Sequence, residues 1–198
     1  MEIDQGLFTY IVALVAVING LGIVRIVGSM GEYIRRRESL KINNYWVYLM
    51  LVLFQLLAHV LIWWGLVALR EIGNINFLQY LYVLLGPTLL FLATSLLLPD
   101  ITDNIVDLRT EYRRLRKPYY SILTVFWAWN IAIWPVFGYP IAPVWKFAAC
   151  WMAIMIILRI TENAKVHAVL ISAAWLLMIA YIGVFALQLG YVSRLMNQ

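Results

Sequence analysis

Five polar side chains fall within long apolar segments, and their types and spacing are the clearest sign of chemistry in this sequence. They are Asn19, Gln55, His59, Thr88 and Asn130. Gln55 and His59 stand four residues apart, so a helix carries both on one face. Hydrocarbon offers no hydrogen-bond partner, so such groups must find one within the protein. Two interpretations stay open: a polar pocket or conduction path, or hydrogen bonds that only hold helices together.

A second set of candidates consists of tryptophans that lie well inside the apolar segments: Trp127, Trp129, Trp151 and Trp175. Indole rings usually prefer the headgroup zones of a bilayer. Deep indoles either pack, with the N–H bonded to a neighbour, or line a site for an apolar ligand. The sequence favours packing, and it leaves a site for a quinone, a carotenoid or a lipid tail open.

The sequence holds no motif for catalysis or metal binding. It has no paired nucleophile and base, no glycine-rich phosphate loop, and a single cysteine, Cys150. His59 and His167 would differ in depth by roughly 20 Å, so one haem cannot take both within one chain. We therefore expect no enzyme activity and no metal site, and a haem held by one histidine stays open.

The elements that must position these side chains are membrane helices. The 198 residues are 64% hydrophobic, with a mean hydropathy of +0.84, whereas soluble domains are about 45–50% apolar. A membrane span needs about 20 mostly apolar residues. We predict an all-α integral membrane bundle of six transmembrane helices in a single domain. The predicted spans are residues 6–27, 45–69, 77–98, 119–136, 144–160 and 166–191.

The segment 99–118 is the longest polar stretch, and we predict an amphipathic helix there on the cytoplasmic membrane surface. Its apolar positions are Ile101, Ile105, Leu108, Tyr112 and Leu115. The alternative, in which this stripe packs on the bundle itself, is equally open.

Basic residues gather in the loops after the first, third and fifth spans, so the positive-inside rule puts both termini outside. The same loops explain the net charge of +5 through anionic lipid, with no need for nucleic acid. The residues expected at lipid headgroups are Arg35, Arg36, Arg37, Arg113, Arg114, Arg116 and Lys117.

Several short motifs resemble those of small bacterial multi-pass membrane proteins for which no activity is known. They are His59-Val-Leu-Ile-Trp63-Trp64-Gly65, Leu69-Arg70, Gly86-Pro87, Leu97-Leu98-Pro99-Asp100 and Arg116-Lys117-Pro118-Tyr119. The resemblance covers the first two-thirds of the chain. It implies a class and a location in a bacterial inner membrane, and it assigns no role to any residue.

Three functions compete at this stage. A passive channel or facilitator is slightly favoured. Six spans make too small a bundle for a wide internal pore, so the polar path would be built by a homo-oligomer. A non-catalytic subunit of a larger membrane complex is the second. A binder of an apolar cofactor or lipid is the third. The absence of Asp and Glu from the predicted spans argues against ion-coupled transport.

Overall fold

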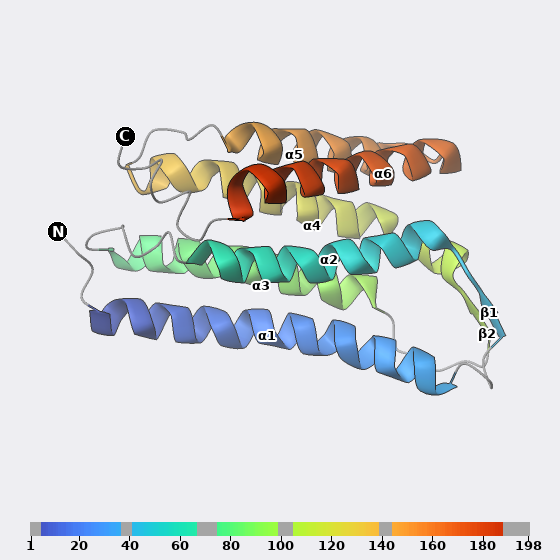
Figure 1. Ribbon diagram of the computed structural model, residues 1–198, viewed down its shortest axis with the longest axis horizontal. Helices are drawn as coiled ribbons and strands as arrows, with labels where there is room; N and C mark the ends of the chain where they lie inside the picture. The colour runs from blue at the N-terminus through green and yellow to red at the C-terminus, as the bar shows by residue number, and fades with distance from the viewer. Residues whose placement is uncertain (1–4, 37–40, 67–74, 99–104, 139–143, 188–198) are drawn as a thin grey trace.

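The computed structural model describes residues 5–36, 41–66, 75–98, 105–138 and 144–187. Within these residues the chain is almost entirely helical (Figure 1). The elements are α1 (Gln5–Arg36), β1 (Lys41–Asn43), α2 (Trp46–Gly65), α3 (Phe77–Leu97), β2 (Ile105–Asp107), α4 (Leu108–Val136), α5 (Trp145–Ile160), α6 (Ala164–Tyr181) and η2 (Ile182–Ala186).

The helices lie side by side as one elongated bundle, and successive long helices run in opposite directions (Figure 1). Helix α2 contacts α1, α3, α4 and α6, so it lies at the centre. Helix α1 packs on α2 and α3 at one side, and α5 packs on α4 and α6 at the other. The main core cluster lies between α2, α3, α4, α5 and α6 and includes the fully buried side chains of Leu51, Leu90 and Trp151.

Four helical stretches are long and apolar enough to cross a membrane: residues Phe8–Arg36, Trp46–Gly65, Phe77–Leu97 and Ala164–Ala186. They fit a helical membrane bundle. The prediction of six spans is not confirmed, because α4 and α5 do not combine the length and the apolar composition that a membrane span needs. Helix α5 has 16 residues, about 24 Å at 1.5 Å per residue, against a hydrocarbon core of about 30 Å. Helix α4 is long enough, but its uncharged part is not apolar enough, because tyrosines, tryptophans, Asn130 and Pro135 interrupt its aliphatic residues.

Helices α1 and α4 are longer than the predicted spans. Helix α1 continues to Arg36, through residues expected to form a loop. Helix α4 begins at Leu108, where the carboxylate of Asp107 accepts from the Arg109 N–H at 3.0 Å and caps the helix.

The separate surface helix predicted within segment 99–118 is therefore wrong in its described part. Its residues from Leu108 onward are the first turns of α4, and Leu108 and Tyr112 are buried against the protein. The Tyr112 ring lies 5.3 Å from that of Tyr45, centroid to centroid. This part of the apolar stripe therefore packs on the bundle, which is the alternative that the sequence left open. Ile101 lies outside the described residues.

Two short strands join the connection after α1 to the connection after α3. Strands β1 and β2 pair in parallel, with Lys41 opposite Ile105 and Asn43 opposite Asp107. This pairing holds the two connections side by side at the end of the bundle where the arginines of α1 and of the first turns of α4 lie (Figure 1). We call this end the basic end.

The carboxyl end of α3 is held by side chains from two other helices. Arg25 of α1 donates to the Leu98 carbonyl at 3.0 Å, and the Tyr48 hydroxyl of α2 donates to the Leu97 carbonyl. A cation at a helix carboxyl end also complements the helix dipole. Arg25 therefore links α1 to α3.

Candidate functional sites: a polar centre and an aromatic pocket

Five buried polar side chains from four helices meet in the middle of the bundle, and we call them the polar centre. They are Asn19 of α1, Gln55 and His59 of α2, Thr94 of α3 and Tyr119 of α4, each at most 1% exposed. The expectation that Gln55 and His59 find hydrogen-bond partners within the protein is confirmed.

The donors and acceptors around Asn19 and His59 in the polar centre can be assigned from their partners. The Asn19 amide donates to the His59 carbonyl at 3.0 Å, so its oxygen is the acceptor for the ring nitrogen Nδ1, 2.6 Å away. A neutral imidazole with a proton on Nδ1 then accepts at Nε2 from the Thr94 hydroxyl, 2.8 Å away. This arrangement fixes both the tautomer and the orientation of the His59 ring.

Gln55 extends the same network to α3 and α4. Its amide nitrogen donates to the Thr94 hydroxyl oxygen and to the Leu90 carbonyl, both at 3.0 Å. Its oxygen accepts from the Tyr119 hydroxyl at 2.8 Å. With these bonds both hydrogens of the amide and its oxygen are satisfied. The polar centre is thus a paired network that joins α1, α2, α3 and α4.

Gly22 makes room for the His59 ring. A Cβ atom on Gly22 would lie 2.2 Å from His59 Cε1 and 2.5 Å from Nε2. No side chain larger than hydrogen fits this gap without moving the imidazole. Gly20 on the same helix differs, because a Cβ there would meet no heavy atom within 4 Å.

Two predicted members of the mid-membrane group lie elsewhere. Thr88 donates to the Leu84 carbonyl of its own helix at 2.8 Å, and Asn130 lines the pocket described below. Thr94 and Tyr119 take their places, and the sequence analysis missed both. The Thr94 hydroxyl oxygen also lies 3.0 Å from the Leu90 carbonyl of its own helix, so a threonine in an apolar run carries no signal that separates the two cases.

A second buried polar cluster lies where α4 begins and α5 meets α6. The Tyr112 hydroxyl contacts His167 Nδ1 and lies 2.9 Å from the Tyr120 hydroxyl. His167 Nε2 lies 3.0 Å from the Thr161 carbonyl, and burial raises the pKa of Tyr112. Because a carbonyl only accepts, Nε2 carries the proton and Tyr112 donates to Nδ1.

Arg116 belongs to this cluster, so the prediction that it reaches lipid headgroups is wrong. It is 7% exposed and donates to the Thr161 carbonyl and to Glu162, the latter at 2.7 Å. The turn between α5 and α6 needs a donor for its carbonyl, and Arg116 supplies it.

The other predicted headgroup residues differ in their partners. Arg35 and Arg36 both pair with Glu32, and Arg114 lies 3.7 Å from Glu111. Arg113 and Lys117 are exposed, and within the described residues neither forms an ion pair. Arg37 lies outside the described residues.

Near the same end, a hydrogen bond from Thr110 lowers the pKa of Asp107, the residue that caps α4.

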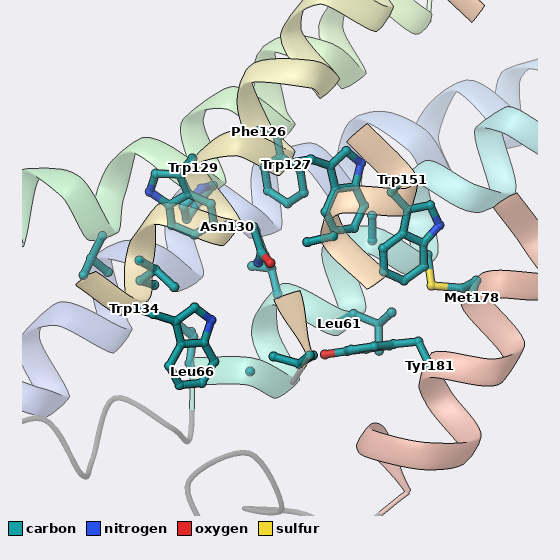
Figure 2. Close-up of a pocket in the computed structure, with 18 of the residues that line it drawn as sticks. Leu61, Leu66, Phe126, Trp127, Trp129, Asn130, Trp134, Trp151, Met178 and Tyr181 are labelled. Atoms are coloured by element: carbon teal, nitrogen blue, oxygen red, sulfur yellow. The ribbon is translucent and has the colours of Figure 1, made fainter. Parts of the chain in front are cut away.

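At the opposite end of the bundle, five helices enclose a pocket of about 200 Å³, which we call the aromatic pocket. Figure 2 shows tryptophan rings on several sides of it. Its lining includes three of the four predicted apolar-ligand tryptophans, namely Trp127, Trp129 and Trp151. Trp175 is not among them: its indole N–H donates to the Met50 carbonyl at 3.2 Å and its ring packs edge-on against Phe54.

Stacking and hydrogen bonds hold the indole walls. Trp127 and Trp151 stack with centroids 4.5 Å apart. Trp129 donates to the Tyr82 carbonyl at 2.8 Å, and the Tyr82 hydroxyl donates back to the Trp129 carbonyl at 2.6 Å. A Cβ on Gly86 would lie 2.2 Å from the Trp129 ring, so this glycine allows the indole to lie flat on α3.

Two polar groups enter the aromatic pocket from different helices. Figure 2 shows the Asn130 amide of α4 and the Tyr181 hydroxyl of α6 between the rings. Among the described residues neither side chain has a hydrogen-bond partner. In the same part of the chain, the buried indole N–H of Trp127 is also unpaired. The pocket therefore offers aromatic surface together with hydrogen-bonding groups that are free for a ligand.

Among the described residues, no three His, Cys, Asp or Glu side chains lie together in a way that would hold a metal ion. Comparison of the chain with protein-family models, with curated proteins and with solved structures found no match. The resemblance to bacterial multi-pass proteins therefore rests on the motifs quoted above. The apolar helices fit an integral membrane protein.

Proposed function

We propose that this protein binds a lipid-soluble, ring-bearing molecule of the quinone type in the aromatic pocket. The observation that carries the proposal is the pairing of indole walls with the free polar groups of Asn130 and Tyr181. Binding sites for small molecules are mostly apolar and carry a few polar groups that fix orientation. A ring carbonyl between the two side chains would accept from the amide or the hydroxyl.

The size of the pocket limits the ligand class. A cavity of about 150 Å³ takes one benzene ring, and this pocket has about 200 Å³. One substituted ring fits, whereas a whole carotenoid does not. Asn130 and Trp127 lie one turn apart on α4, so the polar group and an aromatic wall reach the ring from the same helix.

The polar centre does not support the channel alternative. Conduction needs polar groups that can exchange partners with a passing ion or solute, and here each side chain already has a partner within the protein. Gln55 stands in the middle of the chain of bonds, and an amide neither takes up nor releases a proton at neutral pH. These contacts favour a structural role for His59.

The proposal includes the six-helix membrane arrangement. Helices α4 and α5 pack beside the four apolar stretches in one bundle. Crossing the membrane six times would place the aromatic pocket near the outer boundary, at the depth of the exposed rings of Trp63 and Trp64. A ligand could then enter from the bilayer without passing through water.

Tryptophan fluorescence tests the proposal. We expect a benzoquinone with a ten-carbon tail to quench the purified protein saturably in detergent at a fixed micelle concentration. Gly65→Leu should abolish the saturable part, because Gly65 lines the pocket and a Cβ there meets no heavy atom within 4 Å. The Cβ of the new side chain therefore fits without moving a neighbour, and we expect its larger atoms to fill ligand space.

Trp175→Phe is the matched control, since it removes a tryptophan outside the pocket. Saturable quenching should survive this change. Quenching that rises linearly with the probe, or that is equal in wild type and Gly65→Leu, would contradict the proposal, because it would report partition into the micelle.

A further inference from the structure

A small polar site lies on the outer surface where α4 and α5 pack together near the basic end. Arg159, in the last turn of α5, donates through Nε to the Ser121 hydroxyl of α4 at 2.8 Å. Ser121 in turn donates to the Lys117 carbonyl at 2.7 Å. The guanidinium is thereby fixed at its inner nitrogen, and its two terminal nitrogens have no partner among the described residues.

The nearby charges leave this guanidinium without an anion. Glu162, three residues further on, pairs with Arg116 at 2.7 Å, and no ion pair to Arg159 is formed among the described residues. Lys117 stands one turn before Ser121 on the same face of α4 and is exposed. A fixed guanidinium with two free donors matches the oxygens of a phosphate, which it can bind in a bidentate way.

The surface next to these cations is apolar. Val125 lies one turn beyond Ser121 on α4 and is 53% exposed, and Ile156 lies one turn before Arg159 on α5 and is 41% exposed. Cations and a hydroxyl at the end of a helix pair, followed by exposed aliphatic side chains, have the layout of a phospholipid with its headgroup and the start of its acyl chains.

We infer that the α4–α5 surface binds an anionic phospholipid, with the phosphate on the terminal nitrogens of Arg159, the charge complemented by Lys117, and an acyl chain along Val125 and Ile156. This site is separate from the aromatic pocket, which lies at the other end of the bundle. Of the headgroup residues predicted from the sequence, this site includes Lys117; Arg159 was not among them, and Arg116 is internal.

Native mass spectrometry of the detergent-purified protein tests the inference, with palmitoyl-oleoyl phosphatidylglycerol and the matching phosphatidylcholine as probes. We expect tighter binding of phosphatidylglycerol, and Arg159→Gln should weaken it about fivefold, the effect of one basic group near a membrane surface. Lys117→Gln should weaken it by a smaller factor. Phosphatidylcholine has the same phosphate, but Lys117 and Arg159 repel its choline cation, so it should bind more weakly and its binding should change less.

Arg35→Gln is the control, because Arg35 is an exposed cation at the same end that already pairs with Glu32. It should leave the preference intact. Equal binding of the two lipids, or the same loss in Arg35→Gln as in Arg159→Gln, would overturn the inference.

Arg159→Lys provides an independent check if the glutamine variant does not fold. Lysine keeps the charge but lacks the planar, bidentate donor geometry of the guanidinium, so we expect the preference for phosphatidylglycerol to fall. A preference equal to that of the wild type would reduce the effect to general attraction and would also overturn the inference.

Discussion

The polar centre and the aromatic pocket are built in similar ways but differ in how their polar groups are paired. Each uses a glycine to let a ring approach a neighbouring helix: Gly22 for His59, and Gly86 for Trp129. In the polar centre each side chain is at most 1% exposed, and the side chains form hydrogen bonds with one another. In the pocket Asn130 and Tyr181 face open space.

This difference separates structural polarity from polarity that can act on a ligand. A buried polar group that loses its partner costs about 1–3 kcal/mol, so a fully paired network has strong reason to remain as it is. A polar group beside a cavity has no partner to lose and gains one when a ligand arrives. Depth in the membrane, which grouped Asn130 with His59 in the sequence, does not reveal which case applies.

The largest effect is expected from Gly22→Ala. The new Cβ would meet the His59 ring at 2.2 Å, which forces the imidazole away from Asn19 and Thr94. Overpacking costs about 1–3 kcal/mol, and an orphaned polar group adds a similar amount, so we expect a loss of about 2–6 kcal/mol in unfolding free energy. Unfolding by SDS in mixed micelles measures it.

Gly20→Ala is the matched control for this prediction. It lies on the same helix, and its Cβ would meet no heavy atom within 4 Å. Alanine is also the better helix former, by roughly 0.5–1 kcal/mol. The variant should be as stable as the wild type or more stable. Similar losses at positions 20 and 22 would mean that helix α1 tolerates no side chain on either face and that His59 is not the reason.

A smaller loss of stability, together with a loss of binding, is expected from Gly86→Ala. The Cβ would lie 2.2 Å from the Trp129 ring, so the indole must tilt into the pocket and give up its stack on Tyr82. We expect about 1–3 kcal/mol of destabilisation and weaker quenching by the benzoquinone probe. Unchanged quenching in a folded Gly86→Ala protein would separate Trp129 from the ligand site.

The sequence was sufficient for the class of fold and for part of each site. Apolar length identified α1, α2, α3 and α6, and the four-residue spacing of Gln55 and His59 gave their shared face. The continuation of α4 through Pro118 could not be foreseen, because the apolar stripe around Tyr112 fits lipid and protein equally well. The grouping of Trp127 with Trp151, and not with Trp175, depends on how the helices are rotated against each other.

The burial of Arg116 was missed for a related reason. In the sequence it stands among exposed arginines, with the same composition on either side. Only the turn between α5 and α6, whose Thr161 carbonyl lies beside it, distinguishes this guanidinium from its neighbours. Contacts between residues far apart in the chain leave no local pattern, and both polar clusters depend on such contacts.

The smallest effects are expected at two threonines of α3, which provide the finest test of the comparison. The hydroxyl oxygens of Thr88 and Thr94 both lie within 3.0 Å of the carbonyl four residues earlier in the helix. Thr94 is fully buried and also contacts Gln55 and His59, whereas Thr88 is only partly buried. Thr94→Val leaves His59 Nε2 without a donor and should cost about 1–2 kcal/mol, while Thr88→Val should stay within about 0.5 kcal/mol. Valine keeps the shape of threonine, so packing changes little in either variant. SDS unfolding of the two proteins side by side measures the difference, and equal values would mean that the polar centre adds nothing beyond the internal bond of each threonine.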